Sequence, residues 1–280
     1  MGDMMKGKRG LVMGVANNHS IAWGIAKALA DEGAELAFTY QGEAFGKRAR
    51  PLAESVGSEL LLDCDVEDIA SVDAAFDAIA DKWGSIDFVV HAIAFSDREE
   101  LRGRYADTSR ENFIRSMVIS CFSFTEVAKR AAALMPNGGS IITLTYSGSE
   151  QVTPNYNVMG VAKAALEASV RYLASDFGPD NIRVNAISAG MIRTLAGAGV
   201  SDARMMYNYQ NRNAPLARPI TIEDVGGAGL YLLSDLSSGV TGEVHFVDSG
   251  FSTIAMPRLD ELKEQDRRER SEAAGDQAAE

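Results

Sequence analysis

Short apolar runs alternate along this chain with longer amphipathic segments, and this alternation constrains the fold more than any other feature. The runs have the length of buried strands, and helical periodicity follows most of them. Seven strands are predicted at residues 10–16, 35–40, 59–63, 86–90, 140–145, 182–187 and 243–247. Strands separated by helices pair in parallel with right-handed crossovers. The predicted fold class is therefore α/β, a doubly wound seven-stranded parallel sheet with helices on both faces.

The segments between the strands are predicted to be helices of a single domain. They lie at residues 21–32, 69–83, 110–134, 158–177 and 222–234, with a further basic helix that contains Lys47, Arg48 and Arg50. No Pro/Ser-rich linker divides the chain, and 280 residues suffice for one large domain, which we assign to residues 1–257. Residues 258–280 are charged and rich in Ala, so a frayed helix or disorder is expected there.

The charge and the cysteine content disfavour several classes of function. A formal net charge of −12 opposes non-specific binding to nucleic acid or to anionic membranes. Cys64 and Cys121 suit a reducing compartment rather than a disulfide framework, and with three scattered histidines they give no metal-ligand spacing. No apolar run approaches the roughly 18 residues of a membrane span, and the run at 11–16 is too short for a signal-peptide core. We expect a cytoplasmic protein without a metal site.

The stretch from Tyr146 to Lys163 is the candidate catalytic segment. It lies at the C-terminal edge of the strand at 140–145, where open α/β sheets bind ligands. Tyr156 and Lys163 are seven residues apart, so a helix would place them on one face, about 700° and about 10.5 Å apart. The lysine stem could then carry its ammonium back toward the phenol, whose ordinary pKa of about 10 needs tuning for acid catalysis. The alternative is a core tyrosine beside a surface lysine.

The loop after the first strand is a candidate phosphate turn. It lacks the standard G-x-G-x-x-G pattern, because only Gly14 and Gly24 are available. Free backbone amides of Ser20 and Ile21 at the start of the following helix would still favour a pyrophosphate, with the helix dipole adding to the attraction. The alternative is that Ser20 only caps the helix.

Two further stretches concern the adenosine half of a dinucleotide. The second strand ends at Tyr40-Gln41, without an Asp or Glu to hold a ribose 2′-hydroxyl. Lys47 and Arg48 could meet a 2′-phosphate or form a solvated helix face, so these residues alone do not decide between NADH and NADPH. Asp65-Val66, at the end of the third strand, could bind adenine through a carboxylate and a backbone amide. The alternative is that Asp65 caps the next helix.

Several motifs together carry a family resemblance. The most specific is Tyr146, then Tyr156, then Lys163 within Tyr-Asn-Val-Met-Gly-Val-Ala-Lys. The others are Gly14…Ser20-Ile21-Ala22, Cys64-Asp65-Val66, His91-Ala-Ile-Ala-Phe95, Arg183-Val-Asn-Ala-Ile-Ser-Ala-Gly190 and Gly242-Glu-Val-His-Phe-Val-Asp248. From about residue 5 to 256 the chain resembles the NADH-dependent enoyl-acyl-carrier-protein reductases of bacterial fatty-acid synthesis, which have a Rossmann-like fold. These form a divergent branch of the short-chain dehydrogenase/reductase superfamily. Its ordinary members use Tyr-x-x-x-Lys, and here Gly160 occupies the position of that lysine.

The resemblance implies a role for each matching residue. Tyr146, Tyr156 and Lys163 would be catalytic, and Ser96 would join the two tyrosines in the substrate site. The cofactor would be NADH, with NADPH less favoured, and it would be bound by Gly14, Ser20, Ile21, Gln41, Asp65, Val66, Ile93, Lys163, Ile192, Arg193, Thr194, Leu195 and Ala196. The implied reaction reduces the trans-2 double bond of an enoyl thioester on acyl carrier protein, and the implied assembly is a homotetramer.

Because of three departures from the family pattern, the sequence does not determine the shape of the acyl pocket. Met191 stands where Pro is frequent, and Ala94 stands where Gly is often found. Ser147-Gly148-Ser149 follows Tyr146 with smaller side chains than the family pattern suggests. None of these departures removes a reacting group.

The segment at about 191–220 is the candidate substrate loop. Met206 and Tyr207 suit a mobile lid over an acyl chain, and Met206 is a candidate substrate-binding residue. Four arginines against one aspartate give this segment a local charge of +3: Arg193, Arg204, Arg212 and Arg218 against Asp202. This charge makes the segment a candidate docking surface for acidic acyl carrier protein. The alternative is a solvated loop with scattered arginines.

Two other functions fit the same fold. An ordinary carbonyl reductase or alcohol dehydrogenase would need Tyr-x-x-x-Lys, and Gly160 argues against that assignment. A non-catalytic NAD(H)-binding sensor would not need both tyrosines and the lysine. Consumption of NADH with an enoyl thioester, compared with a ketone and with no substrate, separates the three functions.

Overall fold

The fold is built on one parallel sheet. In the computed structural model, which describes residues 2–195 and 202–277, seven strands pair in the order β3-β2-β1-β4-β5-β6-β7. The strands are β1 (Arg9–Met13), β2 (Glu35–Tyr40), β3 (Leu60–Asp63), β4 (Phe88–His91), β5 (Gly139–Thr145), β6 (Ile182–Ala189) and β7 (Val244–Val247). Every pairing of neighbours in this sheet is parallel. The doubly wound seven-stranded sheet predicted from the sequence is confirmed.

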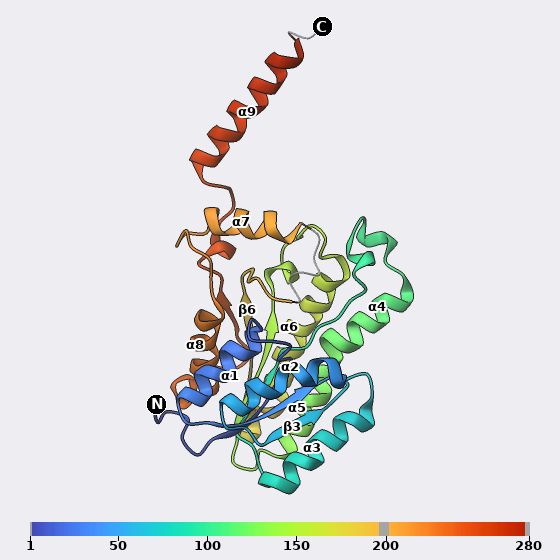
Figure 1. Cartoon of the computed structure of the whole chain (residues 1–280), viewed down its shortest axis with the longest axis vertical. Coiled ribbons are helices and arrows are strands. Elements are labelled where there is room, and N and C mark those ends of the chain that lie inside the picture. The colour runs from blue at the N-terminus through green and yellow to red at the C-terminus, as the bar shows by residue number, and fades with distance from the viewer. Residues whose placement is uncertain (1, 196–201, 278–280) are drawn as a thin grey trace.

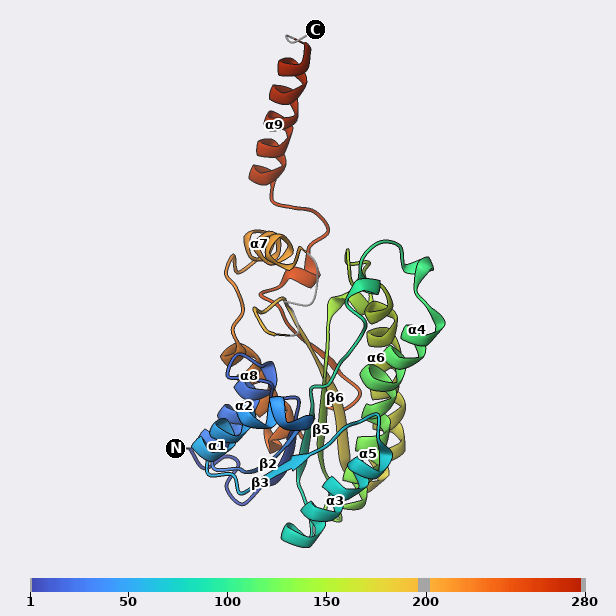
Figure 2. The same cartoon turned by 45° about the vertical axis from the view of Figure 1, so that its right-hand side comes forward.

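Helices cover both faces of the sheet (Figures 1 and 2). One face carries α1 (Ile21–Asp31), α2 (Gly42–Ser55) and α8 (Ile222–Leu233), and the other carries α3 (Ile69–Trp83), α4 (Arg110–Met117), α5 (Ser123–Ala133) and α6 (Asn157–Phe177). Leu11 and Met13 of β1 belong to the core beneath α3, α5 and α6, whereas Val12 belongs to the core beneath α1 and α8. Because strands buried on both faces need apolar residues at every position, they appear in the sequence as continuous apolar runs.

The strand order places a ligand crevice at one edge of the sheet. β2 lies on one side of β1 and β4 on the other, so the order of the strands reverses between β1 and β4. Doubly wound sheets bind ligands outside the C-terminal ends of the strands at such a reversal. Gly14 follows β1 and Ala92 follows β4 at this point.

The long helix predicted at residues 110–134 is interrupted by a π-helical turn at Val118–Phe122. Ser120, within this turn, exchanges hydrogen bonds of 2.9 Å with the backbone N–H and C=O of Phe95. The turn therefore ties the helix to the loop that follows β4. Helical periodicity in the sequence continues across the turn and does not reveal it.

Two helices extend beyond the C-terminal edge of the sheet. α7 (Ala203–Asn213) lies between β6 and α8, in a segment whose sequence shows only weak periodicity. α9 (Leu259–Gln277) forms most of the charged tail and projects away from the body of the molecule (Figures 1 and 2). No helix within the described residues combines the length and the apolar character needed to cross a membrane.

Candidate active site

Two tyrosine rings meet at the C-terminal edge of β5. Tyr146 directly follows β5, and Tyr156 directly precedes α6. The ring centroids are 5.1 Å apart at an interplanar angle of 73°, an edge-to-face contact. Burial raises the pKa of both phenols, and for Tyr156 the neighbouring Tyr146 and Glu167 raise it further. Both phenols are therefore protonated at neutral pH and able to donate a hydrogen bond.

Two glycines permit this close contact of the rings. A Cβ atom at Gly148 would lie 2.6 Å from the ring of Tyr156, and a Cβ atom at Gly160 would lie 2.7 Å from the carbonyl oxygen of Gly148. Close-packed interiors do not accommodate carbon contacts of that length without a shift of the backbone. Any side chain at position 160, including the lysine of Tyr-x-x-x-Lys, would therefore displace the loop that carries Tyr146.

Lys163 is buried on α6, but its relation to Tyr156 differs from the expectation. The Lys163 ammonium donates a 2.8 Å hydrogen bond to the carbonyl oxygen of Leu144, at the end of β5. Tyr156 lies before the helix, and Asn157 follows it with φ of +38°. Tyr156 is thus the N-cap of α6 and not a residue of its regular turns, so the helix geometry assumed for the pair does not apply from Tyr156 onward.

A buried carboxylate accompanies Lys163. Burial lowers the pKa of the Lys163 ammonium to about 8, whereas Cys121 and Glu167 act in the opposite direction, so the ammonium is mostly charged at pH 7. Glu167 lies four residues further along α6, and its Oε1 accepts a 2.6 Å hydrogen bond from Thr145 Oγ1. Lys163 and Glu167 thus hold two consecutive residues of β5 immediately before Tyr146.

Sequence reasoning misses Glu167 as a site residue. The available signal is its spacing of four from Lys163, which places both side chains on one helix face. Charged side chains are rarely buried unless they are paired, so two of them on the buried face of α6 indicate a polar network.

A cavity of about 480 Å³ lies at the ends of β1 to β4. The predicted cofactor residues that line it are Gly14, Gln41, Asp65, Val66, Ile93 and Leu195. Residues that the sequence did not indicate as cofactor-binding also line it: Val15, Ala16, Thr39, Tyr40, Phe45, Cys64, Glu67, Ala92, Ala94, Phe95, Arg115 and Ile119. Among the described residues, the remaining predicted site residues lie outside this lining, including Lys163 and the two tyrosines predicted to be catalytic.

The turn after β1, predicted to bind a pyrophosphate, is tightly folded. Gly14 has φ of +94°, and a Cβ atom there would lie 2.1 Å from the carbonyl oxygen of Ala92, so only glycine is accommodated. The hydroxyl of Ser20 accepts hydrogen bonds from the amides of Ala16 and Asn17, at 3.0 and 3.1 Å. These bonds fold the turn onto the start of α1, and the backbone at Gly14 is left open to the cavity.

The sequence predicts free backbone amides at both Ser20 and Ile21, but only one of these two is free in the structure. The Ser20 amide is not free, because it donates a 3.1 Å hydrogen bond to the carbonyl oxygen of Asn17. The Ser20 side chain makes no capping hydrogen bond to α1 either, so the alternative of a simple helix cap is also wrong. The amides of Ile21 and Ala22 have no hydrogen-bond partner in the described part of the chain, so Ile21 is one of the N–H groups that the first turn of α1 leaves for an anion.

The loop after β3 lines one side of the cavity. Asp65 accepts a 2.9 Å hydrogen bond from the amide of Glu67, while α3 is capped by Asp68, which accepts from the amide of Ala70 at 3.0 Å. The alternative that Asp65 caps this helix is therefore wrong. Glu67 receives two hydrogen bonds, of 2.9 and 2.8 Å, from the guanidinium of Arg115. This pair joins the loop to α4 beside the cavity, a link between distant residues that the sequence does not show.

The segment after β6 connects the cavity with α7. Leu195 lines the cavity, and the amide of Met191 donates a 3.0 Å hydrogen bond to Oε1 of Gln210 on α7. The guanidinium of Arg193 lies 4.6 Å from the ring centroid of Tyr207, also on α7. Of the other predicted residues here, the Thr194 amide donates to the carbonyl oxygen of Ile192 at 2.9 Å, and Ala196 lies outside the described residues.

The two remaining candidates for substrate binding, Ser96 and Met206, lie on different elements of the fold. Ser96 follows β4, and its hydroxyl accepts hydrogen bonds from Asn112 and Ser116 of α4, at 3.2 and 3.0 Å. Met206 is half-buried on α7. The structure thus holds Ser96 firmly through α4.

The cluster of arginines predicted as a docking surface is partly neutralised. Arg212 pairs with Glu261 at 2.6 Å, and Arg218 pairs with Asp224 at 2.7 Å. Glu261 and Asp224 both lie outside the segment at about 191–220, for which the charge of +3 was counted. That count therefore overstates the positive charge around these arginines. Arg204 is exposed on the first turn of α7.

Comparison with known proteins places the chain among its relatives. The family model described as enoyl-(acyl carrier protein) reductase matches residues 14–252. The chain is 70% identical over 263 residues to enoyl-acyl-carrier-protein reductase (NADH) 2 of Rhizobium meliloti (strain 1021), which covers 94% of this chain and 98% of the relative. It superposes with a TM-score of 0.90 on FabI from Candidatus Liberibacter asiaticus, at 59% identity, covering 92% of this chain and 100% of that one. The reductase of Anaplasma phagocytophilum, solved with NAD, also superposes with a TM-score of 0.90. It is 58% identical, and the match covers 92% of this chain and 99% of that one. The chain therefore belongs to the enoyl-(acyl carrier protein) reductase family.

Proposed function

We propose that this chain is an NADH-dependent reductase that saturates the trans-2 double bond of enoyl thioesters on acyl carrier protein, in the last step of the fatty-acid elongation cycle. The observation that carries the proposal is the edge-to-face pair of Tyr146 and Tyr156, which Gly148 and Gly160 permit. A side chain at position 160 is incompatible with this pair, and ordinary ketone reductases of the superfamily have their lysine there. The relatives named as NADH enzymes and the relative solved with NAD support the choice of cofactor.

The proposed cofactor site follows the ends of the strands. We assign the pyrophosphate and adenosine side to Gly14, Ser20, Ile21, Gln41, Asp65 and Val66, and the nicotinamide side to Ile93, Lys163 and residues 192–196. Gly14, which lines the cavity, and the amide that Ile21 offers at the start of α1 suit a pyrophosphate. The ammonium of Lys163 suits the ribose hydroxyls beside the nicotinamide.

The residues of the chain orient the reactants and stabilise charge, while the bound nicotinamide supplies a hydride. Hydride addition at C3 leaves negative charge on the thioester oxygen, to which we assign Tyr156 as hydrogen-bond donor. Lys163 places positive charge nearby, and C2 takes a proton directly or through water. Tyr146, Ser96 and Met206 line the acyl chain, and residues 191–220 form the substrate loop of the 1–257 domain.

Oxidation of NADH followed by absorbance tests this proposal. A crotonyl or longer enoyl thioester should support turnover, whereas a ketone or the absence of substrate should not, and NADPH should be the poorer reductant. Faster turnover of the ketone would instead identify a carbonyl reductase. NADH binding without turnover of any substrate would identify a sensor.

We propose that acyl carrier protein docks beside α7, where Arg204 offers an exposed guanidinium. Arg204→Glu should raise the KM for a carrier-linked enoyl substrate by about tenfold at low salt, because charge reversal opposes an acidic partner. The KM for the matching coenzyme A thioester should stay unchanged, since it lacks the carrier surface. An equal change for both substrates would contradict docking at this residue.

We propose a homotetramer in the cytoplasm. Ile114, Val118 and Phe122 repeat every four residues along one side of α4 and the π-helical turn, and they are 54, 36 and 53% exposed. An apolar stripe of this kind is usually covered in an assembly. Light scattering should report a particle four times the 30.0 kDa of one chain, and a monomer would contradict the assembly. The free thiols of Cys64 and Cys121 support a reducing compartment.

A further inference from the structure

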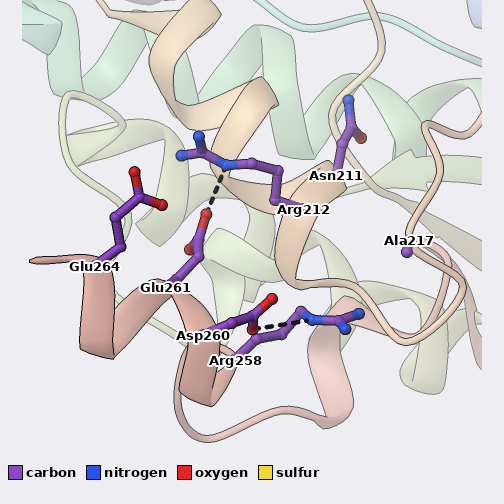
Figure 3. Close-up of a pocket in the computed structure, with 7 residues that line it drawn as sticks. All are labelled: Asn211, Arg212, Ala217, Arg258, Asp260, Glu261 and Glu264. Atoms are coloured by element: carbon purple, nitrogen blue, oxygen red, sulfur yellow. Dashed lines mark hydrogen bonds and ion pairs between the residues drawn. The ribbon is translucent and has the colours of Figure 1, made fainter.

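The first turn of the tail helix α9 is attached to the end of α7 (Figure 3). The two oxygens of the Glu261 carboxylate accept hydrogen bonds of 2.6 Å, one from Nε of Arg212 and one from Nδ2 of Asn213. Asn213 also accepts a 2.8 Å hydrogen bond from the backbone amide of Arg258, through its Oδ1. Asn213 is only 3% exposed, so its amide would lose partners that water cannot easily replace if the tail moved away.

α7 is held at other points by residues adjacent to the proposed site. The Asn155 side chain, next to Tyr156, donates a 3.2 Å hydrogen bond to Asp202 at the start of α7. Gln210, near the other end of α7, accepts from the amide of Met191. α7 therefore contacts the loop before Tyr156, the segment after β6 and the tail. Glu261 supplies the side-chain bonds of its attachment to the tail.

The rest of α9 makes a different set of contacts. Glu264 lies one turn beyond Glu261, and both line a second cavity, at the junction of α7 and the tail (Figure 3). Glu264 pairs with Arg268 of its own helix at 2.6 Å. Arg270 pairs with Asp266 in the same way. Such pairs, four residues apart, support an exposed helix without joining it to anything else. Among the side chains of α9 that the structure describes, those that attach to α7 thus lie in its first turn.

We propose that Glu261 is a positioning residue that holds α7 in place over the acyl chain of the substrate. The proposal rests on the proposed function, because it assigns α7 to the substrate loop. Loss of the carboxylate frees Arg212 and leaves the buried amide of Asn213 short of one acceptor, so the C-terminal turn of α7 should open more often. The acyl site should then be formed for a smaller fraction of the time, and apparent affinity for the enoyl substrate should fall in proportion.

Two alanine variants of the full-length chain provide the test. Glu261→Ala removes the two carboxylate bonds of the attachment and leaves the bond from the Arg258 amide to Asn213. Glu264→Ala removes a carboxylate that lines the same cavity but pairs within α9. The first readout is hydrogen exchange of the α7 amides, which requires no activity. Glu261→Ala should speed exchange in α7 by about tenfold relative to both wild type and Glu264→Ala. Glu261→Gln, which keeps an acceptor but loses the charge, should lie between them.

The second readout separates positioning from general destabilisation. Glu261→Ala should raise the KM for an enoyl thioester by about five- to tenfold, with kcat, the KM for NADH and the melting temperature close to wild type. Unchanged exchange and unchanged KM would overturn the proposal, and so would equal effects from Glu264→Ala. A lower melting temperature with a matching rise in the KM for NADH would also overturn it. If wild type itself did not reduce the thioester, the proposed function would fail, while the exchange result would still decide the attachment.

Discussion

Tyr156→Phe is expected to lower the turnover of an enoyl thioester by about 100-fold, while the affinity for NADH stays nearly unchanged. The substitution removes one hydroxyl and keeps the ring that packs edge-to-face on Tyr146. Burial raises the pKa of the Tyr156 phenol, so the group acts as a hydrogen-bond donor rather than as an anion. Loss of one donor to a developing oxyanion typically costs two to three orders of magnitude in rate, and about 100-fold is the lower end of that range.

Stopped-flow absorbance and calorimetry measure the two quantities separately. Tyr172→Phe is the matched control, because Tyr172 also belongs to α6 but is 76% exposed and has no assigned role in binding. Tyr172→Phe should turn over at the wild-type rate. If Tyr156→Phe did so too, the assignment of the donor would be refuted.

Lys163→Ala is expected to weaken NADH binding by roughly 10- to 100-fold. A hydrogen bond from a charged group typically contributes about 1.5–3 kcal/mol, and the ammonium is assigned to the ribose of the nicotinamide. The Leu144 carbonyl oxygen loses its 2.8 Å partner as well, so the end of β5 should relax slightly. Calorimetry should show the loss for Lys163→Ala and normal binding for Lys129→Ala, a change at an exposed lysine of α5. Normal binding by both variants would refute the cofactor role.

The pH dependence of binding follows from the same lysine. Burial lowers the pKa of Lys163 to about 8, so the affinity of the free enzyme for NADH should fall as pH rises through about 8. In the unfolded chain the lysine has its ordinary, higher pKa. Between the two values the unfolded state binds more protons, so this group makes the folded state more stable as pH rises. A decline in NADH affinity above pH 8 therefore does not reflect unfolding driven by Lys163, and a flat pH profile would contradict the assignment.

The strands and most helices could be predicted because each depends on local pattern. Runs such as 35–40 and 140–145 are apolar enough to be buried on both faces, and helices such as 69–83 repeat their apolar residues with helical spacing. The sequence does not predict α7, since most of its side chains are polar and it is held by particular contacts such as Gln210 with Met191. Contacts between residues far apart in sequence leave no periodic signal.

The residues of the candidate site likewise fall into those that local pattern predicts and those that depend on contacts in the folded chain. The positions of Tyr146 and Lys163 at the end of β5 and on α6 follow from the order of elements. The left-handed conformation of Asn157, directly after the N-cap Tyr156, cannot be read from spacing. The buried carboxylate of Glu167 could be located on a helix face, but its bond to Thr145 required the packed structure.

The central claim is that hydride reaches C3 of an enoyl thioester at the pair formed by Tyr146 and Tyr156. The most direct test supplies the enzyme with NADH deuterated at the transferred position and with an enoyl thioester, and analyses the product by mass spectrometry and NMR. The account predicts a saturated acyl thioester that carries one deuterium, located at C3. Recovery of unreduced enoyl thioester, or reduction of an accompanying ketone to a deuterated alcohol instead, would contradict it.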